Sequence, residues 1–93
     1  MAVTTTVVTV GTTETTLADG GSRHYANPLG GEVENLGSVS VYIGGTGVTT
    51  SGAGRGQILA AGAKRTFTLG PGDKLKGIVA TGTCDVHVIA VGA

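Results

Sequence analysis

The stretch KLKGIVATGTCDVHVIAV, residues 74–91, alternates apolar and polar positions with a period of two. In its first half Leu75, Gly77 and Val79 share one face. In its second half the apolar positions also share one face, and they are Cys84, Val86, Val88 and Ala90. A period of two is typical of a half-buried β-strand, in which successive side chains point to opposite sides. Thr81-Gly82-Thr83 separates the halves, so the pattern predicts two strands joined by a tight hairpin.

The same alternation recurs along the chain, in SVSVYIGG (38–45) and RTFTL (65–69) among other stretches. Thr and Val dominate these runs, and both are β-branched residues that favour strands. No window of eleven residues carries a helical apolar stripe. Strands are expected near 3–10, 12–17, 32–36, 38–44, 57–60, 64–69, 74–81 and 84–91. The sequence therefore predicts a single all-β domain over residues 1–93, a small antiparallel β-sandwich or barrel of seven to eight short strands.

Two local features refine this expectation. Gly70-Pro71-Gly72-Asp73 fits a type II turn, because proline fixes the first central φ and glycine supplies the positive second one. The first six residues are almost all Thr, Val and Ala, and apolar alternation starts only at Val8 and Val10. They fit an edge strand or a free arm, and we expect a flexible N-terminal arm over residues 1–7.

The glycine-rich stretch GGTGVTTSGAGRG, residues 44–56, raises the question of a phosphate site. A dinucleotide-binding fingerprint needs G-x-G-x-x-G between a strand and a helix, and here the sixth position falls on Thr50 or Gln57. A P-loop needs a Gly-Lys pair, which the sequence lacks. The stretch therefore predicts a loop between strands. Its one charged residue, Arg55, is a candidate for contact with a partner.

Composition excludes several function classes. Six Lys and Arg balance six Asp and Glu, so the chain has no electrostatic attraction for nucleic acid or anionic lipid. Its three aromatic residues give no stacking platform for bases. The sequence has no apolar run of eighteen residues, and its start, MAVTTTVVTV, lacks the features of a Sec signal peptide. We expect synthesis in a cytoplasm, no nucleic-acid partner and no membrane partner.

No arrangement of reactive residues predicts catalysis. Cys84 is the only cysteine, and a lone cysteine in a strand pattern is usually a small buried hydrophobe. His24 and His87 lie far apart, and the acidic residues show no metal-ligand spacing. Glu32 and Glu34 share a strand face, which fits a solvated surface better than a catalytic pair. We expect no enzyme activity, metal, cofactor or small-molecule substrate.

One cluster has the composition of a contact site. Ser22-Arg23-His24-Tyr25 combines a cation, an imidazole and an aromatic ring in a long loop, and such side chains are common in interaction hot spots. An alternative is a loop whose tyrosine caps the sandwich. The sequence leaves both open.

The expected core is small for a stable monomer. Its largest apolar side chains are Leu17, Ile43, Ile58, Leu59, Phe67, Leu69, Leu75, Ile78 and Ile89, with no tryptophan. A domain of this size buries a modest share of its surface, and the eighteen glycines lose much conformational freedom on folding. We expect assembly into an oligomer, or docking on a larger scaffold, to contribute to stability.

The segment from Asn35 onward carries a resemblance to a known family. The shared pattern is N-x-G-S-V-x-V-Y-x-G-G, then V-T, then L-x-A-G, then L-x-x-G-D-x-L-x-G-I-x-A-x-G-T-x-x-V-x-V. It falls on Asn35–Gly45, Val48-Thr49, Leu59–Gly62, Leu69–Thr83 and Val86–Val88. This pattern resembles small structural proteins of tailed bacteriophages, and the opening MAVTTTVVTVGTTETTLA is also similar. The likeness covers most of the chain and departs over residues 19–31, which are longer here.

The resemblance implies a capsid decoration (cement) protein on the outer surface of the virion head. Such a protein binds the major capsid protein, sits as a homotrimer at threefold and quasi-threefold positions, and stabilises the shell. The implied N-terminal arm, which would pair with a capsid strand, is Ala2, Val3, Thr4, Thr5 and Thr6. Arg23, His24, Tyr25 and Arg55 are the expected loop contacts to the capsid or to another subunit. The alternative is a head-fibre or tail module that recognises the host surface.

Overall fold

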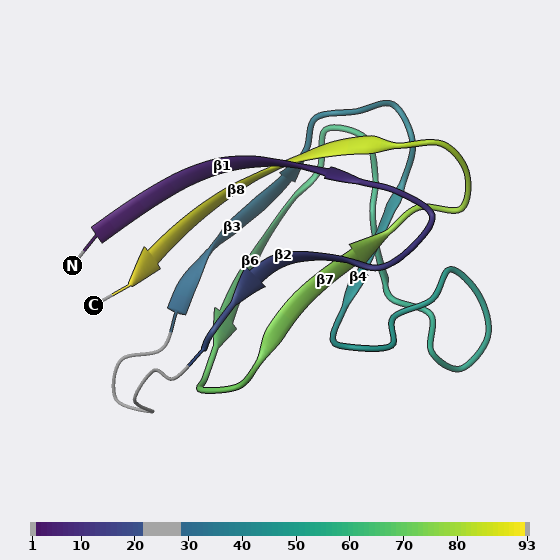
Figure 1. Ribbon diagram of the computed structural model, residues 1–93. Helices are drawn as coiled ribbons and strands as arrows, with labels where there is room; N and C mark the ends of the chain where they lie inside the picture. The colour runs from purple at the N-terminus through teal and green to yellow at the C-terminus, as the bar shows by residue number, and fades with distance from the viewer. Residues whose placement is uncertain (1, 22–28, 93) are drawn as a thin grey trace.

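The computed structural model describes residues 2–21 and 29–92 and has the eight strands that the sequence predicts (Figure 1). They are β1 (Ala2–Val10), β2 (Thr15–Asp19), β3 (Leu29–Asn35), β4 (Val41–Gly44), β5 (Gln57–Leu59), β6 (Lys64–Leu69), β7 (Lys74–Ile78) and β8 (Cys84–Gly92). The described residues contain no helix. The predicted all-β fold is confirmed, and the boundaries differ from the predicted ones by a few residues.

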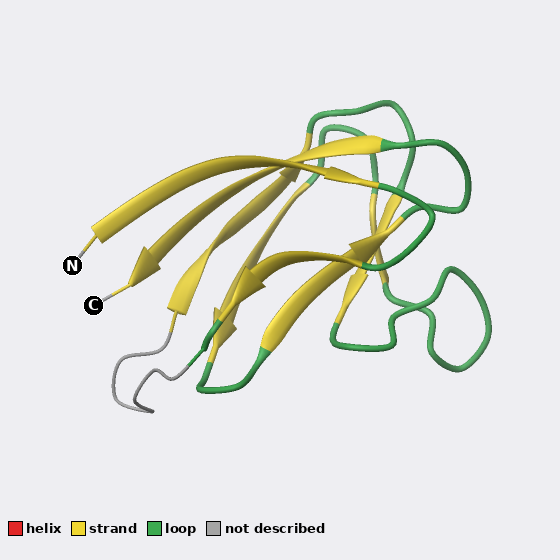
Figure 2. Cartoon of the chain, viewed as in Figure 1, coloured by secondary structure: helices red, strands yellow, loops and turns green. Residues whose placement is uncertain are grey.

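The strands form two four-stranded antiparallel sheets that pack face to face (Figure 2). Sheet A has the order β1-β8-β3-β6, and sheet B has the order β2-β7-β4-β5. Strands β1 and β8, β2 and β7, β3 and β6, and β4 and β5 pair, as in a long antiparallel ribbon folded onto itself. Pairing of β3 with β8 and of β4 with β7 completes each sheet. This sandwich is a jelly roll.

The predicted hairpin at Thr81-Gly82-Thr83 is wrong. Strand β7 belongs to sheet B and β8 to sheet A, so the segment between them crosses from one sheet to the other. Val79 is buried, and its N–H donates to the carbonyl of Gly11 at 3.0 Å rather than to β8. The alternation has a period of two whether the next strand pairs beside the first or stacks across the core, so the sequence pattern does not separate the two arrangements.

The predicted type II turn is confirmed. Gly72 has a φ of 79°, and the N–H of Asp73 donates to the carbonyl of Gly70 at 3.2 Å. A positive φ at this position favours glycine. This turn also joins the two sheets, because β6 lies in sheet A and β7 in sheet B.

The core lies between the sheets and is made largely of valine and leucine. Its main cluster contains Val10, Leu17, Val33, Val41, Ile43, Leu59, Val79, Cys84, Val86 and Val88. Cys84 is buried, as predicted. Three expected core residues lie elsewhere: Ile58 is 46% exposed, and Ile78 and Ile89 are half-buried. Ile58 follows the strand period, because its neighbour Leu59 occupies the inward position.

Asn35, at the end of β3, is buried and polar. Its amide nitrogen donates to the carbonyls of Val39 (2.7 Å) and Leu59 (2.8 Å). Its amide oxygen accepts from the N–H of Gly37 (2.9 Å) and from the thiol of Cys84 (2.9 Å). Because Leu59 belongs to sheet B, this side chain joins the two sheets beside the core.

Residues 2–6 form part of an edge strand rather than a free arm. They pair with β8 in unbroken register from Ala2 opposite Gly92 to Thr6 opposite Val88. The C-terminal strand supplies the ladder, and the β-branched Val and Thr residues favour the extended backbone that it requires. The two ends of the chain consequently lie side by side (Figure 1).

Candidate functional site

The predicted contact residues fall into three places. Ala2 to Thr6 lie together in β1, at the edge of sheet A. Arg55 is exposed at the end of the glycine-rich loop between β4 and β5. Arg23, His24 and Tyr25 lie outside the described residues. The structure therefore brings residues 2–6 together and places Arg55 next to the opposite edge of the sandwich, near β5.

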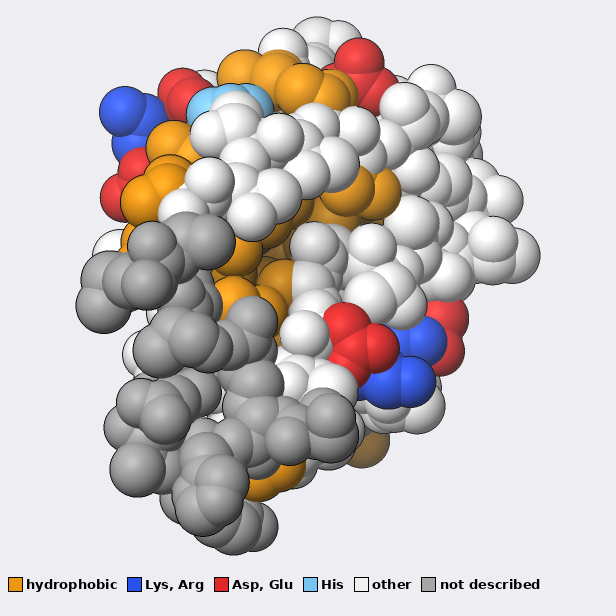
Figure 3. Space-filling model, turned by 60° about the vertical axis from the view of Figure 1, so that its left-hand side comes forward, with side chains coloured by type: hydrophobic (Ala, Val, Ile, Leu, Met, Phe, Trp, Pro, Cys, Tyr) orange, Lys and Arg blue, Asp and Glu red, His pale blue; other side chains and the backbone are white. Residues whose placement is uncertain are grey.

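Strand β1 presents apolar side chains to the outside of sheet A. Val8 and Val10 pack against the core, so Val3, Thr5 and Val7 occupy the opposite, outward face. Val3 is 68% exposed and Val7 is 54% exposed, the two largest values among the exposed large hydrophobic residues described. Opposite them on β8 lie Val91 and His87. Figure 3 shows hydrophobic side chains gathered on the surface of the molecule in this view.

The four edge strands differ in how they discourage pairing with another strand. Native proteins protect such edges with charges, bulges or short length. Strand β2 has a register shift between Thr16 and Ala18 and ends in Asp19. Strand β5 has three residues, and β6 begins with the exposed Lys64 and Arg65. Strand β1 has nine residues, AVTTTVVTV, with no charge and no proline, and its pairing with β8 has no register shift. It is the edge best suited to accept a further strand.

Charged residues on the outward face of sheet A are set back from this edge. Val7 lies opposite His87, His87 opposite Glu34, and Glu34 opposite Lys64, so these four residues form one row across the sheet. Glu32 lies opposite Ile89 in the next row. The prediction that Glu32 and Glu34 share one face is confirmed. They stand one strand away from β8 and two strands away from the free edge.

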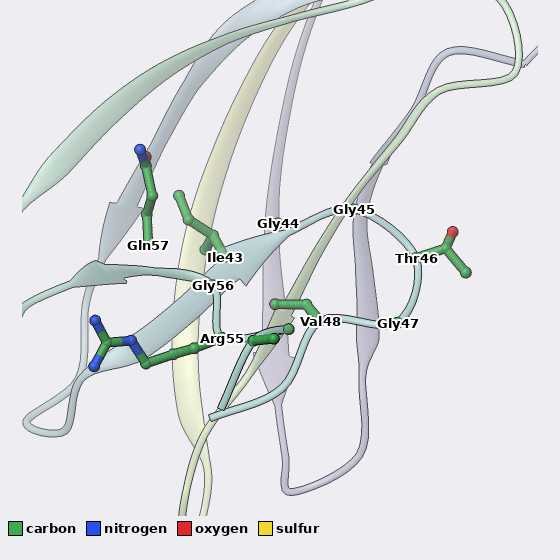
Figure 4. A pocket seen from close by; sticks show the side chains of 11 residues that line it. Ile43, Gly44, Gly45, Thr46, Gly47, Val48, Arg55, Gly56 and Gln57 are labelled. Carbon is green, nitrogen blue, oxygen red and sulfur yellow. The ribbon is translucent and has the colours of Figure 1, made fainter. Parts of the chain in front are cut away.

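The glycine-rich loop folds back on itself. The N–H of Thr49 donates to the carbonyl of Gly54, and the N–H of Gly56 donates to the carbonyl of Thr49, both at 3.0 Å. Val48 is buried beneath the loop. The loop borders an open depression of about 350 Å³ whose lining includes five glycines. Figure 4 shows Thr46 and Arg55 pointing to opposite sides of this loop, and Arg55 is the one charged residue among those that line the depression.

Five backbone N–H groups of this loop have acceptors within the protein. The N–H groups of Val48 and Arg55 donate to carbonyls three residues earlier, at 3.2 Å each. The N–H of Gly47 donates to the carboxylate of Glu14 at 2.8 Å. A phosphate cradle needs several free backbone donors directed at one point. This arrangement favours the predicted connecting loop over an anion site.

Glu14, just before β2, fixes the loop to sheet B. Its carboxylate accepts from Gly47 and forms an ion pair with Lys76 Nζ at 3.3 Å. The hydrogen bond from the Gly47 backbone, followed by the interaction with Lys76, lowers the pKa of Glu14 below its ordinary value. Both interactions join residues far apart in the chain, and the sequence analysis did not find them.

A smaller cleft of about 210 Å³ opens between the sheets where β4 and β5 face β6. Its floor is apolar and includes Val33, Phe67 and Leu75. At its mouth Arg65 Nη1 donates to Gln57 Oε1, which links β6 to β5. Pockets for drug-sized ligands usually measure about 300–1,000 Å³, so this cleft has room for no more than a side chain or a small ring.

The described part of the chain has no group of three or more His, Cys, Asp and Glu residues arranged to hold a metal ion. Among the same residues there is no helix long and apolar enough to cross a membrane. No protein-family model matches the chain, and no curated protein matches it.

Proposed function

We propose that this chain is a capsid decoration protein of a tailed bacteriophage, which binds the outer surface of the mature head and stabilises the shell. The observation that carries the proposal is the β1 edge, nine uncharged residues long and bearing the exposed Val3 and Val7. An exposed apolar strip beside an open strand edge marks a surface for contact with other chains. Contact, rather than reaction with a substrate, is then the work of the protein.

The phage-like sequence pattern and the jelly roll support this class. Jelly rolls occur in viral capsid and lectin domains, although a fold alone does not assign a function. Asn35–Gly45 contains the buried Asn35 and Val41, and Leu69–Thr83 contains the turn at Gly72 and the buried Val79. The pattern thus covers residues that determine the fold. The proposed contact residue Arg55 lies between the segments of this pattern, and β1 lies in the opening stretch that is also similar.

The proposed mechanism is mechanical. Each copy contributes buried area at junctions between major capsid subunits, and a homotrimer at a threefold position binds three times to one lattice. Multiple linked contacts raise the overall avidity far above the affinity of each. We propose Ala2 to Thr6 and Arg55, with Arg23, His24 and Tyr25, as contacts to the capsid or to a neighbouring copy.

The number of copies per particle tests this proposal. Virions of a phage that encodes the chain are purified, and the chain is quantified against the major capsid protein by mass spectrometry. We expect about one copy per capsid subunit. A few dozen copies would instead indicate the alternative, a head-fibre or tail module for host recognition. Absence from the particle would overturn both proposals.

A second measurement separates attachment from mere abundance. Shells that lack the chain are mixed with purified protein and then heated or exposed to a denaturant. We expect the shells to bind the protein to saturation and to withstand a higher temperature than undecorated shells. Saturable binding without any gain in shell stability would contradict the stabilising role.

A further inference from the structure

We propose that β1 is a self-association strand: two copies of this chain pair antiparallel through β1, about a twofold axis at Thr5. The pairing joins the two copies of sheet A into one continuous eight-stranded sheet. The inference concerns this chain alone and does not depend on the proposed role on a capsid.

Residues 3–7 of β1 are symmetric about Thr5. Residues 3–7 read Val-Thr-Thr-Thr-Val. An antiparallel partner centred on Thr5 therefore places Val3 opposite Val7 of the second copy, Thr5 opposite its own equivalent, and Thr4 opposite Thr6. Cross-strand pairs of β-branched residues and of threonines stabilise antiparallel sheets. The most exposed valines of each copy would then cover each other.

The surroundings of β1 suit the same register. On the side of β1 away from the seam, the neighbours of Val3 and Val7 on β8 are Val91 and His87, and the neighbour of Thr5 is Ile89. Glu32 and Glu34 lie on β3, beyond β8. Asp85, opposite Thr9, lies outside the paired segment, where its carboxylate accepts from Thr9 Oγ1 at 2.7 Å. No two like charges meet at the seam.

The other edges of the molecule fit a second copy of β1 less well. Strand β6 presents Lys64 and Arg65, β5 is three residues long, and β2 is broken by a register shift. Each device opposes pairing with an added strand. A head-to-tail contact between β1 and one of these edges is therefore disfavoured. A twofold contact uses the same surface on both copies and closes after two. On a lattice, such contacts would link neighbouring threefold clusters.

Analytical ultracentrifugation of the purified chain tests the pairing. We expect the wild-type protein to sediment as a dimer, at twice the chain mass of 9.1 kDa. Val7→Lys should raise the dissociation constant of the dimer roughly 30-fold. Because the axis is twofold, the substitution removes two Val3–Val7 pairs and places two charges at the seam. Circular dichroism should show that the variant stays folded, because Val7 is outward-facing.

Ile58→Lys is the matched control, because it places the same charge at an exposed apolar residue of the edge strand β5. We expect it to leave the dimer intact. A monomeric wild-type protein at millimolar concentration would overturn the proposal. So would a larger oligomer that Val7→Lys does not affect, or equal weakening by Ile58→Lys.

Cross-linking tests the register. In the proposed pair the two Thr5 residues face each other, at a separation that suits a disulfide. The two Val3 residues are four positions apart, about 13 Å along the strands. Thr5→Cys should therefore form a covalent dimer under mild oxidation, whereas Val3→Cys should not. Wild type is the control, since its Cys84 is buried. Cross-linking through residue 3 but not residue 5 would overturn the twofold register.

Discussion

The two edge strands of sheet A, β6 and β1, differ in charge. Strand β6 starts with Lys64 and Arg65, both exposed, whereas β1 has no charge in nine residues and exposes Val3 and Val7. Both strands have one neighbour in the sheet. The same fold therefore discourages strand addition on one side and permits it on the other. Protection of an edge therefore depends on the sequence of that strand and not on the jelly-roll fold.

The two sides also differ in how the sheets are joined. On the β5–β6 side, Asn35 bonds to Leu59 of β5, and Arg65 of β6 bonds to Gln57 of β5. On the β1 side, Val8 and Val10 contribute apolar packing against the core. Side-chain hydrogen bonds thus join the sheets on the β5–β6 side, whereas apolar packing joins them on the β1 side.

Asn35→Ala should have the largest effect on stability. It removes the amide that serves two carbonyls, one backbone N–H and the Cys84 thiol. A buried polar group left without a partner costs about 1–3 kcal/mol. For the whole substitution we expect the free energy of unfolding to fall by about 3 kcal/mol. Urea denaturation measures it. Ser40→Ala, an exposed polar residue nearby, is the control and should change stability by less than about 0.5 kcal/mol.

Strand positions were predictable from the sequence because burial alternates along strands such as β4 and β8. Partners were not, since β7 and β8 show the same alternation although they lie in different sheets. The assignment of Ile58 to the core failed because Ile58 and Leu59 are adjacent apolar residues, and only one of two neighbours can face inward. Which strands pair, and which of two adjacent apolar residues faces the core, depends on contacts between distant segments. A local sequence pattern does not contain these contacts.

The contact surface was predictable in part. Residues 2–6 were selected by residue type and do lie on an edge, but as a paired strand. Val7 was missed although the sequence holds a signal for it: Val7 and Val8 are adjacent, so one of them must face outward. The structural roles of Asn35 and Glu14 were not predicted. Their hydrogen-bond partners, Leu59 and Lys76, lie far from them in the sequence.

Removing the charges of β6 should make the two edges alike. Lys64→Val combined with Arg65→Thr gives a β6 strand without charge, as in β1. Each copy would then offer two open edges, so we expect association beyond the dimer, seen as light scattering that grows with protein concentration. The control replaces the exposed Lys74, on the central strand β7, with valine. Scattering equal in the two variants would show that lost charge, rather than an opened edge, causes association.

Val3→Thr should weaken β1 pairing with little effect on the folded monomer. The substitution keeps the β-branched shape and replaces a methyl group by a hydroxyl in two symmetric cross-strand pairs. We expect the dissociation constant of the dimer to rise roughly fivefold. Because Val3 is 68% exposed, the unfolding midpoint measured at a concentration where the protein is monomeric should stay unchanged. A lower monomer midpoint would mean that Val3 supports the fold itself.

Glu14→Gln should have the smallest effect, and its size should depend on pH. The folded state lowers the pKa of Glu14 below its ordinary value of 4.5, first through the Gly47 N–H and then through Lys76. The ionised carboxylate therefore stabilises the fold at pH values above the ordinary pKa. This contribution is lost as the pH falls through the lowered pKa. We expect Glu14→Gln to reduce Tm slightly at pH 7 and not at pH 2. In a Lys76→Met background the pH 7 difference should shrink without vanishing, because the hydrogen bond from Gly47 remains. Complete loss of the difference in that background would make the ion pair, rather than the backbone donor, the tie that fixes the loop.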